Sequence, residues 1–391
     1  MNKSNTYRAG RHFLQVPGPT NIPDRILKAM DAPCMDHRGP KFQELSKNIL
    51  ERIKLIFKSS DPVVIYPSAG TGAMEASLVN TLNEGDKILM FETGEFATQW
   101  AQAAKRFKIN VDFVSLDWRT GADPNIVKEK LLADKNKEIK AILVTHNETS
   151  TGIKSRVEEI RKAIDETNHP ALFMVDTISS LGSYNYEHQK WKVDVTVGGS
   201  QKGLMLPPGM SFNAISTKAL EAYKNSKMPK SYFDWGQMLE NNKNGFYPYT
   251  PATNLLYGLN EAIDMLLEEG LENVFARHKR HAEATRLAVE AWGLEILAKN
   301  PIERSDSITA VMVPKGHDSD SLRKIIYDNY DMSLGTGLNK VKGKVFRIGH
   351  MGDFNDLMLS GTLAGVEMGL KQSGIPFKPG GIMAALDFLS K

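Results

Sequence analysis

The stretch Val193-Asp-Val-Thr-Val-Gly-Gly-Ser-Gln-Lys-Gly203 runs from β-branched residues into two glycines and a single lysine, Lys202. An earlier run, Ala171-Leu-Phe-Met-Val-Asp176, ends in an acid. Both runs are short and continuously apolar, which is typical of strands that are buried on both faces of a sheet. Because ligands bind beyond the carboxyl ends of such strands, we expect Asp176 and Lys202 to face one ligand at one edge.

The rest of the first two thirds of the chain repeats this strand pattern, with helical patterns in between. Strands are predicted at 63–66, 87–91, 111–114, 141–145, 172–175 and 193–197. Helices are predicted at 41–57, 74–82, 96–107, 125–132 and 157–167. The alternation predicts an α/β fold with a mostly parallel sheet.

The pattern changes after Tyr257. We expect one long helix over 259–292, which bridges to a smaller α+β domain with strands at 308–313 and 345–348 and helices from Ser319 and Asn355. The start of the chain is rich in Pro and Gly and reads as an extended arm. We therefore predict an arm over 1–20, a large domain over 21–270 and a small C-terminal domain over 271–391.

The composition disfavours nucleic acids, membranes and metal ions as partners of this chain. A net charge of +3, from 49 basic and 46 acidic residues, is too balanced to indicate nucleic acid or a membrane surface. One cysteine, Cys34, and nine histidines without HExxH-like spacing make a metal site unexpected. No apolar run approaches the roughly 18 residues of a membrane span, and the polar start has no signal core. We expect a cytoplasmic protein that binds small molecules.

Lys202 and Asp176 together suit pyridoxal phosphate (PLP). An amine can form a Schiff base with this cofactor, and an acid can keep its pyridine nitrogen protonated. Taken singly, Lys202 is more commonly a surface lysine, and Asp176 is more commonly an acid that caps the following turn. The glycines that flank Lys202 leave room for a bulky ligand near the backbone.

Three further segments suit the same cofactor or a substrate. Ser68-Ala-Gly-Thr-Gly-Ala-Met-Glu-Ala76 follows a predicted strand and opens a helix, which makes an anion site or an ordinary glycine-rich turn. It has neither a dinucleotide fingerprint nor a Walker lysine. Thr149 or Ser150 could donate to the phenolate oxygen of PLP. Arg347 could bind a substrate carboxylate through its fork or form a salt bridge between domains.

In order along the chain, these segments resemble the class V, fold-type I aminotransferases, and within them the serine–glyoxylate and alanine–glyoxylate group. The resemblance extends from the Pro17-Gly-Pro-Thr segment through Arg347. Its markers are Gly70-Thr-Gly-Ala-Met-Glu-Ala, His146-Asn-Glu-Thr, Val175-Asp, Gly199-Ser-Gln-Lys, Tyr247-Pro-Tyr-Thr-Pro and Lys344-Val-Phe-Arg-Ile-Gly-His.

The resemblance implies a role for each site residue. Lys202 would be the Schiff-base lysine and Asp176 the partner of the pyridine nitrogen. The phosphate would be held by Gly70, Thr71, Gln201 and, from the second subunit of a homodimer, Tyr247 and Thr250. The remaining contacts would be Phe96 stacking on the ring in place of a tryptophan, Thr149 at the ring hydroxyl, Arg347 at the substrate carboxylate, and His37 and Arg38 at the partner's site.

The implied activity is the transfer of an amino group from a small amino acid to glyoxylate. L-Serine is the favoured donor, which would give hydroxypyruvate and glycine, and L-alanine and L-aspartate are the alternatives. His37 stands where plant serine-specific relatives carry tyrosine, so the donor stays open. More distant alternatives are a PLP-dependent lyase of the same fold and a nucleotide-binding oxidoreductase. The position of Cys34 disfavours a desulfurase, and the missing dinucleotide fingerprint disfavours the oxidoreductase.

Overall fold

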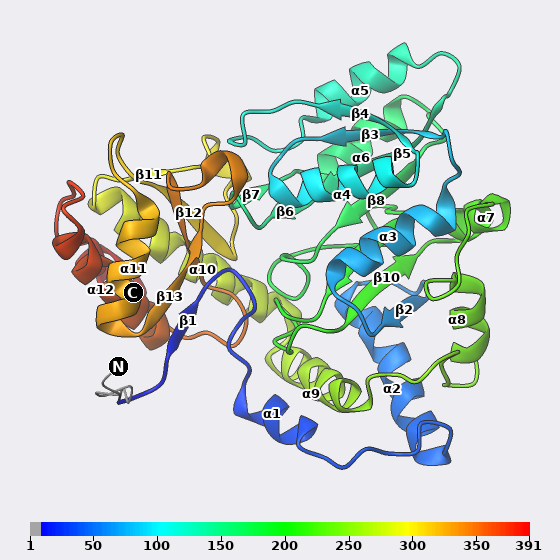
Figure 1. Cartoon of the computed structure of the whole chain (residues 1–391), viewed down its shortest axis with the longest axis horizontal. Coiled ribbons are helices and arrows are strands. Elements are labelled where there is room, and N and C mark those ends of the chain that lie inside the picture. The colour runs from blue at the N-terminus through cyan, green and yellow to red at the C-terminus, as the bar shows by residue number, and fades with distance from the viewer. Residues whose placement is uncertain (1–8) are drawn as a thin grey trace, which may run out of the picture.

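The computed structural model describes residues 9–391, so the first eight residues of the predicted arm lie outside the described residues. A seven-stranded sheet forms the centre of the larger part of the molecule (Figure 1). Its strands, in spatial order, are β2 (Val63–Tyr66), β10 (Ser211–Ile215), β9 (Val195–Gly199), β8 (Leu172–Asp176), β5 (Ile139–Thr145), β3 (Lys87–Phe91) and β4 (Asn110–Val114).

The sheet is mostly parallel, as the sequence predicts. All six predicted strands are present, and every neighbouring pair is parallel except the two that involve β10. The strand β10 was not predicted, because Ser211-Phe-Asn-Ala-Ile215 is short and carries polar residues among its apolar ones. It runs antiparallel to both β2 and β9.

Side chains of the central strands alternate between two separate hydrophobic cores, which explains the continuous apolar runs. In β3, Ile88 and Met90 join the core with α3 (Gly70–Thr81) and α4 (Glu95–Arg106). Leu89 and Phe91 join the other core with α5 (Pro124–Ala133) and α6 (Val157–Glu166). Helices therefore cover both faces, and the carboxyl ends of the strands stay available for a site.

Further elements surround this sheet. They are α1 (Asp24–Met30), α2 (Pro40–Ile56), the short strands β6 (Asn147–Glu148) and β7 (Ile153–Lys154), α7 (Thr217–Asn225) and α8 (Trp235–Asn242). The predicted helix over 41–57 corresponds to α2, whose first residue is a proline, a residue that suits this position because it needs no hydrogen bond there.

A smaller α+β unit lies beside the large one, at the left of Figure 1. Its sheet has the order β1 (Phe13–Gln15), β13 (Met332–Thr336), β14 (Val345–Gly349), β12 (Ile308–Met312) and β11 (Glu295–Ile296). Its helices are α11 (Ser319–Tyr330), α12 (Asp356–Ser373) and α13 (Gly381–Leu389), with 3₁₀ turns at Pro301–Glu303 and Asn339–Val341. The N-terminal segment thus adds strand β1 to this sheet. The predicted limits 1–20, 21–270 and 271–391 stay a prediction.

The prediction of a single long helix over 259–292 is wrong. Two helices, α9 (Thr253–Glu269) and α10 (Leu271–Ala291), meet at Gly270. Gly270 has a φ of 82°, in a region that glycine occupies readily and a continuing right-handed helix does not. The apolar period runs on through Gly270, so periodicity alone did not reveal the break.

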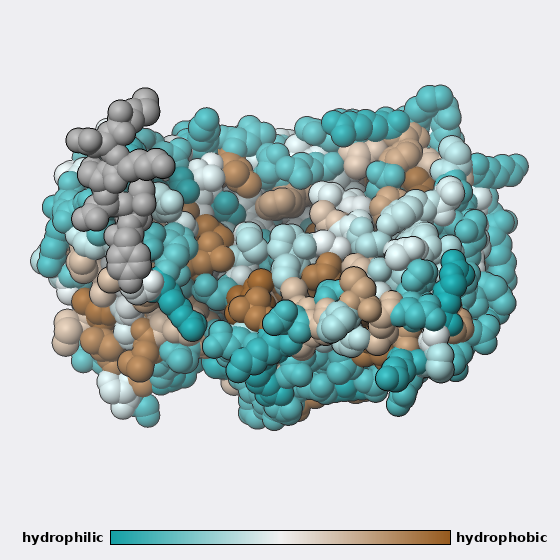
Figure 2. Space-filling view, turned by 60° about the horizontal axis from the view of Figure 1, so that its bottom comes forward, coloured by the Kyte–Doolittle hydropathy of each residue, from teal (hydrophilic) through white to brown (hydrophobic). Residues whose placement is uncertain are grey.

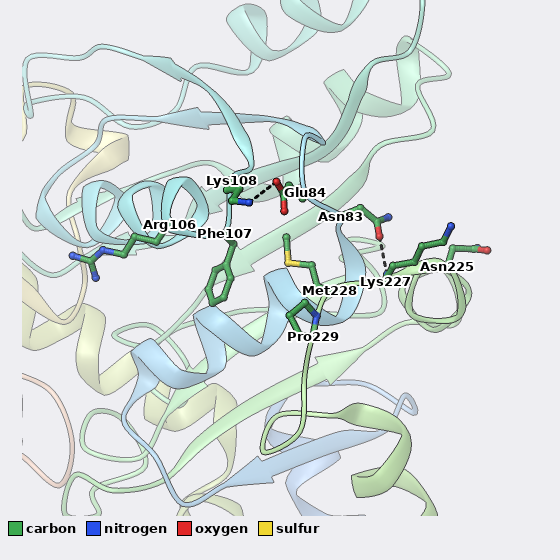
Figure 3. A pocket seen from close by; sticks show the side chains of 9 residues that line it. All are labelled: Asn83, Glu84, Arg106, Phe107, Lys108, Asn225, Lys227, Met228 and Pro229. Atoms are coloured by element: carbon green, nitrogen blue, oxygen red, sulfur yellow. Dashed lines mark hydrogen bonds and ion pairs between the residues drawn. The ribbon is translucent and has the colours of Figure 1, made fainter.

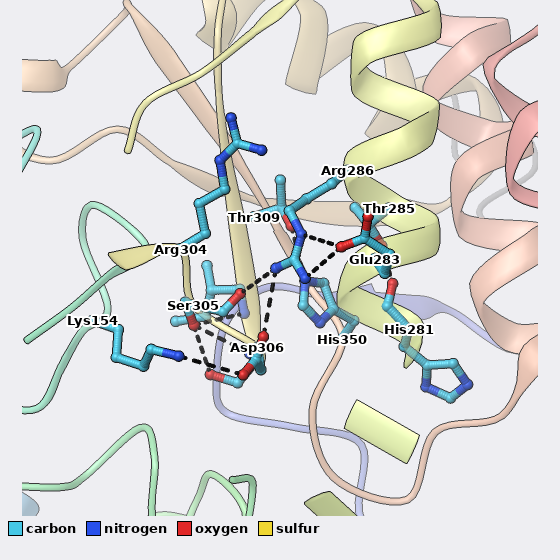
Figure 4. A network of polar contacts seen from close by, with 12 residues as sticks. Lys154, His281, Glu283, Thr285, Arg286, Arg304, Ser305, Asp306, Thr309 and His350 are labelled. Carbon is cyan, nitrogen blue, oxygen red and sulfur yellow. Dashed lines mark hydrogen bonds and ion pairs between the residues drawn. The ribbon is translucent and has the colours of Figure 1, made fainter. Parts of the chain in front are cut away.

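A polar network joins the small unit to the large one near the carboxyl ends of the strands (Figure 4). Asp306 lies 3.7 Å from Lys154 of β7 and 3.5 Å from Arg286 of α10. Next to it, Asn147 donates to the carbonyl oxygen of Ser179 at 3.1 Å and to the hydroxyl of Ser307 at 3.0 Å. Residues on both units of the structure therefore hold the loops around this edge in place.

Candidate active site

The structure brings Asp176 and Lys202 to the same edge of the sheet. Asp176 is the last residue of β8, and Lys202 follows the end of the adjacent strand β9 by three positions. Both are buried, with exposed fractions of 3% and 6%. A buried acid and a buried amine on neighbouring strand ends are the arrangement expected from the sequence.

Burial sets the protonation of both groups. Burial, followed by the positive charge of Arg347, lowers the pKa of Lys202 from 10.5 to about 7, against the opposite effects of Asp176 and Glu148. Burial also raises the pKa of Asp176 from 3.8 to about 7. A lysine that can lose its proton near neutral pH is suited to act as a nucleophile or a base.

Each of these two side chains has a backbone partner. The Lys202 amine donates to the carbonyl oxygen of Pro17, and the Thr20 hydroxyl donates to the carbonyl oxygen of Lys202 at 3.2 Å. In the Asp176 carboxylate, Oδ1 accepts from Ile178 N at 2.9 Å. The turn-capping contact considered from the sequence is therefore present, and it leaves Oδ2 as a second acceptor.

The glycine-rich turn after β2 has the form of an anion site. The helix α3 begins at Gly70, and its N-cap residue Ala69 makes no side-chain cap. Free N–H groups at a helix N-terminus favour anions. A cavity of about 610 Å³ opens here and is lined in part by Ser68, Thr71 and Gly72. A Cβ atom at Gly70 would overlap Cδ1 of Ile178, so a larger residue here would require that side chain to shift.

Several buried polar atoms around this edge have no hydrogen-bond partner among residues 9–391. They are Gln201 Oε1, Thr93 Oγ1 and Thr145 Oγ1, each at or just beyond the end of a strand. Buried polar atoms are almost always paired in folded proteins, so atoms left unpaired at a strand edge point to a missing polar ligand. With the anion turn, the acid and the amine, they fit PLP.

Arg347 lies in β14 and is 6% exposed. Its guanidinium donates to the carbonyl oxygens of Thr336, at 2.8 Å, and Thr149, at 2.6 Å. No acidic side chain in the described part of the chain pairs with it, so the salt bridge considered from the sequence does not form there. Burial lowers the pKa of Arg347 from 12.5 to about 10, and Glu148 opposes the shift. A ligand with a carboxylate group could therefore form an ion pair with the buried guanidinium of Arg347.

Phe96 and Thr149 are both adjoined by Glu148, a buried carboxylate that is not among the predicted site residues. Phe96 is half-buried in the first turn of α4, and Thr149 directly follows Glu148. Glu148 is fully buried, and its carboxylate accepts the backbone N–H groups of Phe96 and Ala97. The residue stood inside the quoted motif His146-Asn-Glu-Thr, but no spacing rule connects it with a helix fifty residues earlier.

Four of the predicted residues lie apart from Lys202. Tyr247 is buried against Phe42 of its own chain, with ring centroids 6.1 Å apart, and Thr250 is exposed. His37 is half-buried and Arg38 is exposed, just before α2. In the described part of one chain, no hydrogen bond or ion pair links any of these four to Lys202 or Asp176.

A larger cavity, of about 710 Å³, lies at the opposite ends of α3 and α4 (Figure 3). It is lined by C-terminal helix ends and by Lys108, which pairs with Glu84 at 2.7 Å. Basic residues at such ends offset the negative end of the helix dipole. None of the predicted site residues lines it, so its size does not make it the active site. Within residues 9–391, no group of three or more acids, histidines or cysteines is placed to hold a metal ion.

Comparison with known proteins gives a consistent result. The family model described as aminotransferase class V matches residues 12–343. The chain is 47% identical to a serine–glyoxylate aminotransferase of Methylorubrum extorquens over 98% of this chain and 97% of the relative. It is 44% identical to an L-aspartate–glyoxylate aminotransferase of Paracoccus denitrificans over 95% and 94%. The crystal structure of ureidoglycine–glyoxylate aminotransferase from Bacillus subtilis superposes with a TM-score of 0.90 at 26% identity, covering 99% and 100%.

Proposed function

Since this chain belongs to the class V aminotransferases, we propose that it transfers the amino group of L-serine to glyoxylate, giving hydroxypyruvate and glycine. The chain is a PLP-dependent aminotransferase, as its family and its fold-type I neighbours indicate. The observation that carries the choice of substrates is the 47% identity to a serine–glyoxylate aminotransferase over nearly the full length of both chains.

The proposed chemistry depends on the two buried strand-end residues. Bound PLP supplies an electron sink that stabilises charge at the substrate Cα. Lys202 would hold the cofactor covalently and, once released, move the proton from Cα as a general base and return it as an acid. A pKa near 7 gives the amine access to both protonation states at neutral pH. Asp176 would hold a proton at the ring nitrogen.

The other residues would orient the reactants. Gly70, Thr71 and Gln201 would hold the phosphate at the N-terminus of α3, where Gln201 would donate through its amide nitrogen. Phe96 would present a flat apolar face to the ring and Thr149 a hydroxyl to the ring oxygen. Arg347 would bind the carboxylate of the amino acid. Its hydrogen bond to the carbonyl oxygen of Thr149 would then be replaced by one to the charged carboxylate.

The residues that lie apart from Lys202 lead us to propose a homodimer with shared sites. The Tyr247 and Tyr249 hydroxyls are buried with no partner among the described residues, and Thr250 and Arg38 are exposed. A second copy would bring Tyr247 and Thr250 to the phosphate, and His37 and Arg38 to the substrate. Figure 2 shows separate hydrophobic areas among hydrophilic ones on the face it displays. A second copy of the chain could cover such areas.

We also propose a cytoplasmic location. Cys34 is free and exposed, as suits a reducing compartment. No helix among the described residues is long and apolar enough to cross a membrane. Cys34 lies on the segment before α2, where its thiol is 3.8 Å from Asn254 Oδ1, and no hydrogen bond within residues 9–391 links it to Lys202, which does not favour a cysteine-dependent lyase reaction.

A donor panel tests the substrates. With glyoxylate as the acceptor, we expect kcat/KM for L-serine to exceed that for L-alanine by at least about tenfold, because a site that hydrogen-bonds a hydroxyl penalises a substrate without one. L-Aspartate, with its second charge, is expected to be poorer still. The measurement is the rate of glycine formation at limiting donor concentrations. A higher value for L-alanine or L-aspartate would replace serine as the donor and leave the aminotransferase reaction standing.

The rate at which PLP-free protein takes up PLP should rise with pH and level off above about pH 7. Lys202 must be neutral to attack the aldehyde, and its lowered pKa places the loss of its proton in that range. The growth of the visible absorption band after PLP is added measures this rate. A rate that still rises steeply near about pH 10 would mean that Lys202 keeps the ordinary pKa of a lysine.

A further inference from the structure

Glu148 makes an unusual set of contacts for a buried acid. Its Oε1 accepts from Ser150 Oγ at 2.7 Å, from Ser150 N at 3.1 Å and from Phe96 N at 3.3 Å. Its Oε2 accepts from Ala97 N at 3.0 Å. The carboxylate therefore joins two segments that lie about fifty residues apart in the sequence: the loop after β5 and the first turn of α4.

This carboxylate takes the place of a local helix cap. The N-cap residue of α4 is Gly94, which has no side chain to accept the free N–H groups of the first turn. A Cβ atom at Gly94 would overlap Glu148 Cγ and Ser150 Oγ, so the glycine makes room for the distant acid. A negative charge at this end of the helix also interacts favourably with the helix dipole.

We propose that Glu148 is a positioning residue, which fixes Phe96 and Thr149 around the cofactor by holding the first turn of α4 against the loop after β5. The proposal rests on the proposed site. Phe96 contributes one of the N–H groups that Glu148 binds, and Thr149 is the next residue along the chain. The carbonyl oxygen of Thr149 in turn accepts from Arg347. One carboxylate thus sets the positions of the stacking face, the ring-hydroxyl contact and the carboxylate-binding arginine.

The charge of Glu148 acts on the same groups. It raises the pKa of Lys202 and that of Arg347, against the effect of burial on each. Removal of this charge would leave the Lys202 amine with a smaller tendency to hold its proton. Glu148 should therefore influence both the geometry and the protonation of the site without contacting the substrate.

Glu367 provides a matched control. It is also a buried carboxylate that caps a helix from a distance, because it accepts the N–H groups of Gly380 and Ile382 at the start of α13, both at 3.0 Å. It also accepts from the indole of Trp292 at 2.9 Å. It lies in α12 of the small unit, and the hydrophobic core of that unit contains none of the predicted site residues. A glutamine there changes a helix cap of the same kind, on a helix that carries none of the predicted site residues.

The test compares Glu148→Gln with Glu367→Gln. For each purified apoprotein, PLP is titrated and the visible circular dichroism of the bound cofactor and the Tm are recorded. We expect Glu148→Gln to raise the Kd for PLP about tenfold, the effect of losing one buried hydrogen bond to a charged group, and to change the dichroic band. Glu367→Gln should lower the Tm comparably and leave both cofactor properties within about twofold of wild type.

The outcome that overturns the proposal is a Glu148→Gln protein with a lowered Tm but with wild-type PLP affinity and dichroism. If Glu148→Gln does not fold, Ser150→Ala decides, because it keeps Glu148 and removes the hydroxyl that donates to its carboxylate at 2.7 Å and accepts from Glu95 N of α4 at 2.9 Å. It should weaken PLP binding about threefold, and an unchanged Kd and band would reject the positioning role. If wild-type protein binds PLP but transfers no amino group between any tested donor and 2-oxo acid, the proposed substrates are contradicted. The comparison of PLP binding between Glu148→Gln and Glu367→Gln would still test the positioning role.

Discussion

Lys202→Ala should lower kcat for serine–glyoxylate transamination by more than about 10⁴-fold. The variant loses the amine proposed to hold the cofactor and to move the Cα proton, and acid–base catalysis alone contributes about 10² to 10⁴. The measurement is steady-state glycine formation by protein whose PLP content has been determined. The variant should still bind PLP without a covalent link, because the anion turn at Gly70 and Thr71 is intact.

Lys218 serves as the control for this substitution. It also lies on the large unit, where it donates to the carbonyl oxygen of Ala171 at 2.7 Å and pairs with Asp194 at 3.4 Å. Lys218→Ala should keep kcat within about twofold of wild type. Retention of full activity by Lys202→Ala would remove Lys202 from the mechanism.

The second large effect is expected for Asp176→Asn, with kcat lower by about 10- to 10³-fold. A neighbouring carboxylate shifts the pKa of a cationic partner by about one to three units, and an amide does not supply that charge. The effect should fall on kcat more than on the KM for serine, since the proposed role of Asp176 is at the cofactor rather than at the substrate. Rates and Tm values measured together separate chemistry from folding.

Asp194→Asn is the matched control for that result. Asp194 is a buried acid that directly precedes strand β9 of the same sheet. Its carboxylate accepts from Phe173 N at 2.7 Å and from the Ser216 hydroxyl at 3.0 Å. Its substitution should reduce the Tm with little change in kcat. If Asp176→Asn behaved in the same way, Asp176 would be a structural acid only.

The sequence predicted the parts of the fold that depend on local pattern. Continuous apolar runs gave six of the seven strands of the large sheet, because burial on both faces removes polar residues from them. Periodicity did not reveal the end of α9, since one glycine with a positive φ breaks the backbone without breaking the apolar stripe. The strand β10 carries Ser211 and Asn213, whose side chains pair inside the fold, so it lacked a strand signal.

The candidate site was accessible to sequence reasoning only where a residue ends a strand or opens a helix. Asp176, Lys202 and Gly70 meet that condition, and the structure brings all three to one edge. Glu148 and Pro17 act through contacts between distant segments, which no local spacing encodes. Tyr247, Thr250, His37 and Arg38 require a second copy in the proposed dimer, so neither the sequence nor one chain brings them to Lys202.

The most direct test of the central claim is the serine half-reaction, followed by absorption spectroscopy. Wild-type protein loaded with PLP is mixed with L-serine in the absence of any 2-oxo acid, and glyoxylate is added afterwards. The visible band should disappear with serine as hydroxypyruvate forms, and should return with glyoxylate as glycine forms. A band that serine leaves unchanged, or that disappears without hydroxypyruvate, would contradict the account.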